Sequence, residues 1–123
     1  MIYLAAPYSD PDAFVRQLRF EATCSATAAL VRAGQQVFSP IVHGHPLTQH
    51  GVPGHWAFWE RHARWHLERC DEAVVLMLDG WQESEGVQAE IRIAGELGKA
   101  VSYRHPVRPT PTVLTNPTDH GEY

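Results

Sequence analysis

The segment that most limits the possible folds is the unbroken apolar run AVVLML, residues 73–78. A strand with one solvated face alternates apolar and polar side chains, whereas a strand of a parallel sheet covered on both faces is apolar throughout. The turn-forming residues Asp79-Gly80-Trp81 end the run. We therefore expect the centre of a parallel sheet here, with helices packed on both of its faces.

The rest of the chain alternates short apolar runs with longer segments of helical pattern. The apolar runs predict further strands over residues 2–6, 36–39 and 100–103. The segments between them predict helices over residues 11–33, 56–69 and 85–98. Ser9-Asp10-Pro11 offers capping side chains and a proline suited to a first helical turn, and Gly34 would close the first helix. Residues 40–55, rich in Pro, Gly and His, are expected to form a loop.

This order of elements predicts an α/β fold, an open, doubly wound parallel sheet of four to five strands with helices on both faces. We assign residues 1–104 to one domain and residues 105–123, which contain four prolines, to a C-terminal arm. In such sheets ligands bind beyond the carboxyl ends of the strands, near the point where strand order reverses. The loops expected at residues 7–10, 40–55 and 79–86 are therefore candidate walls of a ligand site.

Composition argues against several classes of function. The chain has 123 residues, a formal net charge of −4 and ten scattered Lys and Arg residues, so nothing suggests a groove for a nucleic-acid polymer. No apolar run approaches the roughly 20 residues of a membrane-spanning helix, and the N-terminus does not read as a signal peptide. Cys24 and Cys70 are too few and too far apart for a disulfide framework or a thiolate metal site. We expect a cytoplasmic protein that binds a small molecule.

The third predicted helix places a carboxylate on its apolar side. At about 100° per residue, Glu90 falls between Ala94 and Leu97, on the face expected to pack on the sheet. Three ordinary explanations are a dipole or capping-box role, a buried partner such as an arginine, and a tilted helix with a wet edge. The functional explanation is a carboxylate held in the crevice over the strand ends, where burial raises its basicity. Ser84 and Gly86 would stand at the mouth of that crevice, where a helix N-terminus attracts anions.

Three stretches of the sequence resemble the nucleoside 2-deoxyribosyltransferase family, in particular its small bacterial and phage-associated branch. They are IYLAAPYS at residues 2–9, CDEAVVLMLDGWQESEGVQAEI at residues 70–91, and the pattern A-x-x-L-G-K-A-V that ends at Val101. The resemblance covers most of residues 1–103 in order and spacing. It implies a flavodoxin-like fold and assembly as dimers or larger homo-oligomers, and we expect no cofactor.

The resemblance also implies a reaction. In that family the glutamate of the S-x-G-x-x-x-E stretch is the nucleophile, which corresponds to Glu90, and Tyr3 matches a tyrosine that orients it. Breaking an N-glycosidic bond builds positive charge on the sugar carbon, and a carboxylate beneath that carbon can stabilise it and bond to it. The expected function is therefore cleavage or transfer at the N-glycosidic bond of a (deoxy)nucleoside or nucleoside 5′-monophosphate.

The substrate-binding residues implied by the resemblance come from several parts of the chain. The loop near the sugar and its 5′ end corresponds to Pro7, Tyr8 and Ser9, and Ser84 resembles a serine that binds 5′-phosphate. The family borrows a polar side chain from a neighbouring subunit, and Thr115 or Asn116 stands at that offset. Arg16 or Arg19 can also meet a 5′-phosphate, unless both simply face solvent.

The sequence departs from the family at an aspartate close to the nucleobase or sugar. Ala63 takes that place, so the acid is either absent or replaced by His62 or Asp79. A stacking partner for the base is expected among three tryptophans, Trp56, Trp59 and Trp81.

Two other functions compete with glycosidic chemistry. A non-catalytic nucleotide-binding module would use Glu90 to hold a ribose hydroxyl, and the substitution at position 63 favours it. A metal-dependent hydrolase would use histidines with the spacing of metal ligands, either His43 and His45 or His62 and His66. No acidic residue stands between the helical pair to act as a base, so we expect no metal site.

Overall fold

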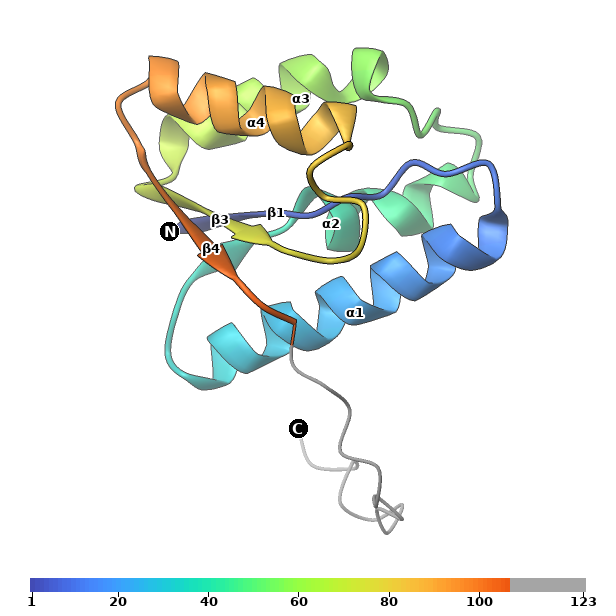
Figure 1. Ribbon diagram of the computed structural model, residues 1–123, viewed down its shortest axis with the longest axis horizontal. Helices are drawn as coiled ribbons and strands as arrows, with labels where there is room; N and C mark the ends of the chain where they lie inside the picture. The colour runs from blue at the N-terminus through green and yellow to red at the C-terminus, as the bar shows by residue number, and fades with distance from the viewer. Residues whose placement is uncertain (107–123) are drawn as a thin grey trace, which may run out of the picture.

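The computed structural model describes residues 1–106 and shows a four-stranded, all-parallel sheet in the order β2-β1-β3-β4 (Figure 1). The strands are β1 (Ile2–Ala5), β2 (Val37–Phe38), β3 (Glu72–Leu76) and β4 (Ala100–Arg104). The strand order reverses between β1 and β3, as in the flavodoxin-like arrangement. The fold predicted from the sequence is confirmed. Thr115, Asn116 and the rest of the arm from residue 107 onward lie outside the described residues.

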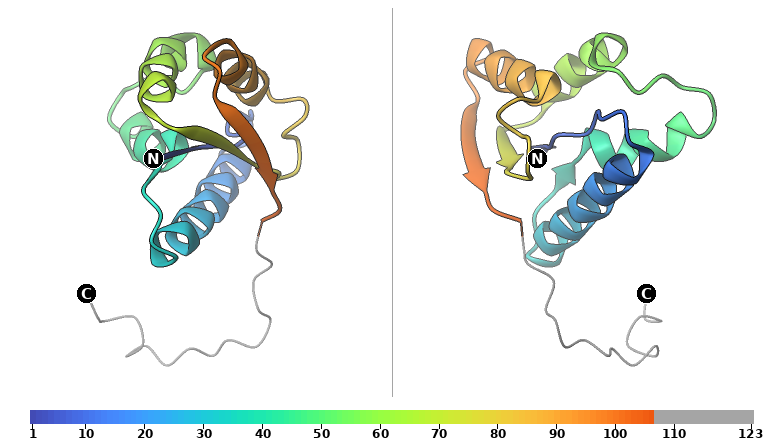
Figure 2. Two further views of the ribbon diagram at one scale, coloured as in Figure 1. Left: turned by 90° about the vertical axis from the view of Figure 1, so that its left-hand side faces the viewer. Right: turned by 45° about the vertical axis from the view of Figure 1, so that its right-hand side comes forward.

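Helices cover both faces of this sheet. The helices are α1 (Ala13–Arg32), α2 (Pro40–Thr48), α3 (Trp56–Arg69) and α4 (Glu85–Glu96). α1 packs on one face, and α3 and α4 lie side by side on the other (Figures 1 and 2). None of the helices within residues 1–106 is long and apolar enough to cross a membrane.

The first helix begins two residues later than predicted. Asp12 is its N-cap, and its side chain accepts a hydrogen bond from the Phe14 backbone N–H at 2.8 Å. Asp10 instead accepts the Asp12 N–H at 2.9 Å, so it orders the turn before the helix rather than the helix itself. The helix ends as predicted, with Gly34 at φ +91°, a conformation that glycine adopts without a steric penalty.

The expectation of a loop over residues 40–55 is wrong, because α2 occupies its first half. Ser39 caps this helix by accepting the Val42 N–H at 3.1 Å. Pro40 stands in the first turn, where its missing N–H has no cost. Ile41 then packs against the apolar side chains between the sheet and α1. Prolines that break a helix in its interior can thus begin one, and the irregular connection shrinks to the residues between α2 and α3.

The core has two halves because successive side chains of β1 point to opposite faces of the sheet. Tyr3 packs with Val75 and Ile93 on the side of α3 and α4. Leu4 packs with Leu30 and others on the side of α1. Side chains this deeply buried each contribute roughly 1.5–3 kcal/mol through removal from water.

Candidate active site

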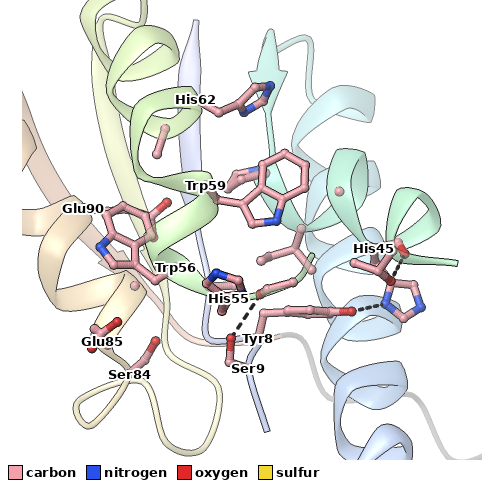
Figure 3. A pocket seen from close by; sticks show the side chains of 18 of the residues that line it. Tyr8, Ser9, His45, His55, Trp56, Trp59, His62, Ser84, Glu85 and Glu90 are labelled. Carbon is pink, nitrogen blue, oxygen red and sulfur yellow. Dashed lines mark hydrogen bonds between the residues drawn. The ribbon is translucent and has the colours of Figure 1, made fainter. Parts of the chain in front are cut away.

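A cavity of about 390 Å³ opens beyond the carboxyl ends of β1 and β3, between α2, α3 and the start of α4 (Figure 3). Its volume lies in the range of small-molecule sites. Eight residues predicted from the sequence line it: Tyr8, Ser9, Trp56, Trp59, His62, Ser84, Gly86 and Glu90. The switch point of the sheet therefore brings together residues from three segments, the loop after β1, α3 and the start of α4.

Glu90 is buried in the wall of this cavity, with 5% of its surface exposed. Tyr3 reaches it from β1, and the Tyr3 hydroxyl donates a hydrogen bond to Glu90 Oε2. Glu90 forms no ion pair with any described residue. Of the ordinary explanations, a wet helix edge and an arginine partner within residues 1–106 are both wrong. A capping role is also wrong, because Ser84 caps α4 through the Val87 N–H.

Burial without a cation makes Glu90 an unusually weak acid. Removal from water raises the pKa of its carboxyl group from 4.5 to about 8, although the hydrogen bond from Tyr3 acts in the opposite direction. At pH 7 roughly a tenth of the molecules then carry the ionised form. Glu90 can therefore hold a proton or exist as a desolvated, basic carboxylate under ordinary conditions.

Tyr3 holds the carboxylate in place from outside the cavity lining. Its side chain is fully buried, and its ring lies 5.8 Å from that of Phe38. Burial, followed by the nearby Glu90 charge, raises the pKa of Tyr3 well above its usual range. The phenol therefore stays protonated and remains a hydrogen-bond donor to Glu90.

Two of the three candidate tryptophans form cavity walls. The Trp59 indole N–H donates to the Pro53 carbonyl at 2.6 Å, and its ring packs over Gly44. Trp56 lies over Gly86, where the absence of a side chain gives its ring room (Figure 3). Trp81 does not line the cavity and packs on Tyr103 instead, at 5.5 Å between ring centroids. A flat ligand group can thus meet aromatic surface from α3.

Of the two residues considered as replacements for the acid missing at position 63, His62 lines the cavity and Asp79 does not. Ala63 is buried in the wall, and Asp79 is exposed and lies outside the lining. His62 does line the cavity, and burial, together with the charges of His66 and His43, lowers its pKa. Two carboxylates that sequence reasoning missed, Glu83 and Glu85, also line it. Their position depends on the path of the turn before α4, which no periodic pattern encodes.

The histidines pack as aromatic groups and not as a set of ligands. The rings of His43 and His62 lie nearly parallel at 5.2 Å, and His66 stacks on Phe38 at 3.8 Å. Within residues 1–106 there is no group of three or more His, Cys, Asp or Glu side chains that could hold a metal ion. The metal-dependent alternative thus gains no support from the described part of the chain.

His45 is a wall residue that the sequence suggested only as a metal ligand. It is 8% exposed, and its Nδ1 lies 2.6 Å from the Tyr8 hydroxyl. Its Nε2 lies 2.9 Å from Gln17 Oε1, and its ring stacks on Phe20 at 4.3 Å. Burial and the charge of Arg16 lower the pKa of His45. A neutral imidazole therefore links the loop after β1 to α1.

Two further predicted residues lie near the cavity without lining it. Pro7 is a fully buried residue of the loop after β1, and the Asp79 backbone carbonyl accepts a hydrogen bond from Arg19. The Arg19 guanidinium donates to the carbonyls of Tyr8, Ser9 and Asp79 at 3.3, 3.0 and 3.2 Å. Arg19 therefore ties together the loop after β1 and the loop after β3. Asn116, the remaining predicted residue, lies outside the described residues.

Comparison with known proteins places this site within a described family. Residues 1–105 match a family model whose description is "Domain of unknown function (DUF1937)", and this range includes every residue of the cavity wall. No curated protein matches the chain.

Proposed function

The chain belongs to the DUF1937 family, and we propose that it cleaves or transfers the N-glycosidic bond of a (deoxy)nucleoside or nucleoside 5′-monophosphate, with Glu90 as the nucleophile. One observation carries the proposal. A carboxyl group without a cationic partner among the described residues is buried beside a cavity of ligand size and held by the Tyr3 hydroxyl. The resemblance to nucleoside 2-deoxyribosyltransferases independently gives the same residue the same role.

The reaction proceeds in two displacements. The ionised Glu90 carboxylate bonds to the anomeric carbon while the bond to the nucleobase breaks, and the bonding electrons leave with the base. A water molecule or a second nucleobase then attacks the same carbon and releases the carboxylate, which gives hydrolysis or transfer. Burial suits the first step because a carboxylate with a raised pKa is a stronger nucleophile than an exposed one.

Binding and departure of the base involve α3 and the start of α4. The indoles of Trp56 and Trp59 provide a surface on which a planar base stacks. The departing base takes up a proton, and three titratable side chains of the wall can supply it directly or through water: His62, Glu83 and Glu85.

The proposal includes a cytoplasmic homo-oligomer, as the family resemblance implies. In that assembly Asn116 or Thr115 of a neighbouring subunit would complete the site. Sedimentation of the full chain beside a variant that ends at residue 106 tests this. If the full chain is an active monomer, no neighbouring subunit contributes a residue to the site.

A screen for release of free base tests the reaction. Nucleosides and their 5′-monophosphates are incubated with the protein, with and without a second base. Glu90→Gln should lower the rate by at least about three powers of ten, because the nucleophile is lost. Glu96→Gln, an exposed carboxylate on the same helix, is the matched control and should keep the rate. An unchanged rate in Glu90→Gln would reject the nucleophile.

Trapping provides the direct test of the covalent step. A deoxynucleoside with fluorine at the 2′ carbon slows the second displacement, so the sugar should remain on the peptide that contains Glu90. Mass spectrometry of the digested protein detects the adduct, and the Glu90→Gln variant should not form it.

A non-catalytic nucleotide-binding module is the second candidate. Ala63 favours it, because the cavity lacks an acid at the position where the resembling enzymes have an aspartate. Saturable binding of nucleosides or nucleotides without turnover of any of them would decide for the module.

A further inference from the structure

A second hollow adjoins the cavity that contains Glu90. It measures about 610 Å³ and lies between the first turns of α1 and the end of α2. Six residues line both spaces: Tyr8, Ser9, His45, Thr48, Gly54 and His55. The two spaces therefore adjoin along these residues, next to the hydrogen bond between the Tyr8 hydroxyl and the His45 ring.

The two spaces differ in charge. Glu83 and Glu85 flank Ser84 at the α4 end of the first cavity, and Glu90 lies nearby. The second hollow contains the Arg16 guanidinium, with Asp10 as the single carboxylate among the described residues that line it. An anionic group is thus disfavoured beside Ser84 and favoured beside Arg16.

Arg16 has donors to spare, in contrast to its neighbour Arg19. Arg16 is half-buried, and one of its nitrogens donates to the Asp10 backbone carbonyl. It forms no ion pair with a carboxylate of residues 1–106. Arg19 instead contacts three backbone carbonyls and serves to hold the loops. A guanidinium has five N–H donors in a planar fork that matches phosphate oxygens, so Arg16 can bind a phosphate without losing its present contact.

We propose that the second hollow binds the phosphate chain of a nucleotide and that Arg16 is its principal contact, so that the ligand carries a pyrophosphate and not a bare 5′-hydroxyl. The inference rests on the proposed function for one point, the placement of the sugar over Glu90. From there the 5′ side of the sugar runs past Tyr8 and Ser9 toward Arg16. The second hollow measures about 610 Å³, which gives room for more than one phosphoryl group.

Hydrogen bonds hold the side chains at the boundary between the two spaces in place. The Tyr8 hydroxyl and the Gln17 side chain both hydrogen-bond to the His45 ring, so these three side chains near Arg16 hold one another in place. His45 stays uncharged at neutral pH because burial and the Arg16 charge lower its pKa. Arg16 is therefore the permanent positive charge among the described residues that line the second hollow, which also contains the His55 side chain.

Calorimetric binding to the Glu90→Gln variant, which prevents turnover, tests the inference. The ligands are a nucleoside, its 5′-monophosphate and its 5′-diphosphate for each common base, a dinucleotide joined by pyrophosphate, and inorganic pyrophosphate. Affinity should rise at least about tenfold from monophosphate to diphosphate, since charge-assisted hydrogen bonds are added. The dinucleotide and the diphosphate arms tell whether the pyrophosphate belongs to a nucleoside polyphosphate or to a dinucleotide.

Two arginine substitutions, each made in the Glu90→Gln protein, test whether Arg16 causes the gain in affinity from the second phosphate. Arg16→Gln should abolish the gain from the second phosphate, whereas Arg32→Gln removes the same charge from the other end of α1 and should keep it. Equal affinity for nucleoside, monophosphate and diphosphate overturns the inference, as does an equal loss in both variants. A thermal melt of each variant confirms that it is folded.

The outcome is separable from that of the proposed function. Diphosphate binding that depends on Arg16, with no release of base by the unmodified protein, would reject the nucleophile and keep the phosphate site. Release of base with no preference for phosphates would keep the reaction and reject the phosphate site.

Discussion

The two faces of the sheet are built from the same strands, but one is closed by apolar packing and the other borders a cavity. On the α1 side, Leu4 and Leu76 are fully buried among aliphatic neighbours and line neither of the two spaces described above. On the α3 and α4 side, the alternate residues of the same strands include Tyr3, whose hydroxyl meets Glu90 at the wall of a cavity. Adjacent residues of β1 thus differ in role: Leu4 packs in the apolar core, whereas Tyr3 donates a hydrogen bond to the buried carboxyl group of Glu90.

The difference shows how a small domain accommodates a destabilising group. A buried carboxyl group costs free energy, and apolar packing such as that around Leu4 on the opposite face offsets costs of this kind. Substitutions on the α1 side should therefore mainly change the stability of the fold. Substitutions on the α3 and α4 side should also change the proposed reaction.

The largest effect on stability is expected from Leu4→Ala. Truncation of this fully buried side chain should lower the free energy of unfolding by about 2–5 kcal/mol, from lost transfer energy and the void left behind. Urea denaturation measures the loss. Base release per folded molecule should stay within about twofold of the unmodified protein. A folded Leu4→Ala variant without activity would break the division between the faces.

Glu90→Gln should have a pH-dependent effect on stability of up to a few kcal/mol. The folded state keeps the Glu90 proton up to about pH 8, whereas the unfolded chain releases it near 4.5. The stability that this proton provides is complete below pH 4.5 and is lost as the pH rises through about 8. Glutamine has no proton to lose, so the variant should match the unmodified protein at pH 4.5 and exceed it at pH 9.

Denaturation curves at several pH values measure this difference. Glu96→Gln is again the control, because this exposed carboxylate pairs with Arg64 at the surface and should change stability by less than about 1 kcal/mol at any pH. A pH-independent difference between Glu90→Gln and the unmodified protein would contradict the buried, uncharged state of Glu90.

Tyr3→Phe should act mainly on the pH dependence of the reaction. The hydrogen bond from Tyr3 lowers the pKa of Glu90, so its removal should move the midpoint of the rise of kcat/KM with pH from near 8 to a higher value. At pH 7 the rate falls about tenfold for each unit of that shift. Tyr103→Phe, at an exposed tyrosine of β4, should leave the profile unchanged. An unshifted profile in Tyr3→Phe would mean that the hydroxyl does not tune the carboxylate.

The smallest effect is expected from Gly44→Ala, in the α2 wall of the cavity. A Cβ at this position would lie 3.5 Å from the Trp59 ring, which is ordinary contact. Replacement of a glycine within a helix should raise the free energy of unfolding by about 0.5–1 kcal/mol. Gly80→Ala should do the reverse, because position 80 has φ +89° and a Cβ there would lie 2.8 Å from an Arg19 nitrogen. Thermal melts of the two variants should shift in opposite directions.

The sheet and its helices were predictable because their patterns are local. The predicted helix over residues 56–69 is confirmed at both ends, and the helix predicted from residue 85 begins there. The strand predicted over 73–78 ends earlier, at Leu76, since the backbone leaves the β3 register where the loop over the crevice begins. Glu90 was identified from helical periodicity alone, and its burial follows from that same periodicity.

What the sequence did not predict depends on contacts between distant segments. His45 meets Tyr8 and Gln17 across separations of 37 and 28 residues, and no local pattern encodes such a meeting. Glu83 and Glu85 enter the cavity wall because of the path of the turn that precedes α4. α2 was not predicted because Pro40, Gly44 and Pro46 are typical of loops and because Ser39, which caps it, was assigned to the preceding strand.

Arg19 joins the loop after β1 to the loop after β3 through hydrogen bonds from a single side chain. Its guanidinium joins the carbonyls of residues 8 and 9 to that of residue 79. Neither loop can swing away alone without giving up those bonds, so opening and closing should be a single cooperative event. Amide protons of the two loops would then exchange with solvent at one shared rate, and a ligand that protects one loop would slow the other equally.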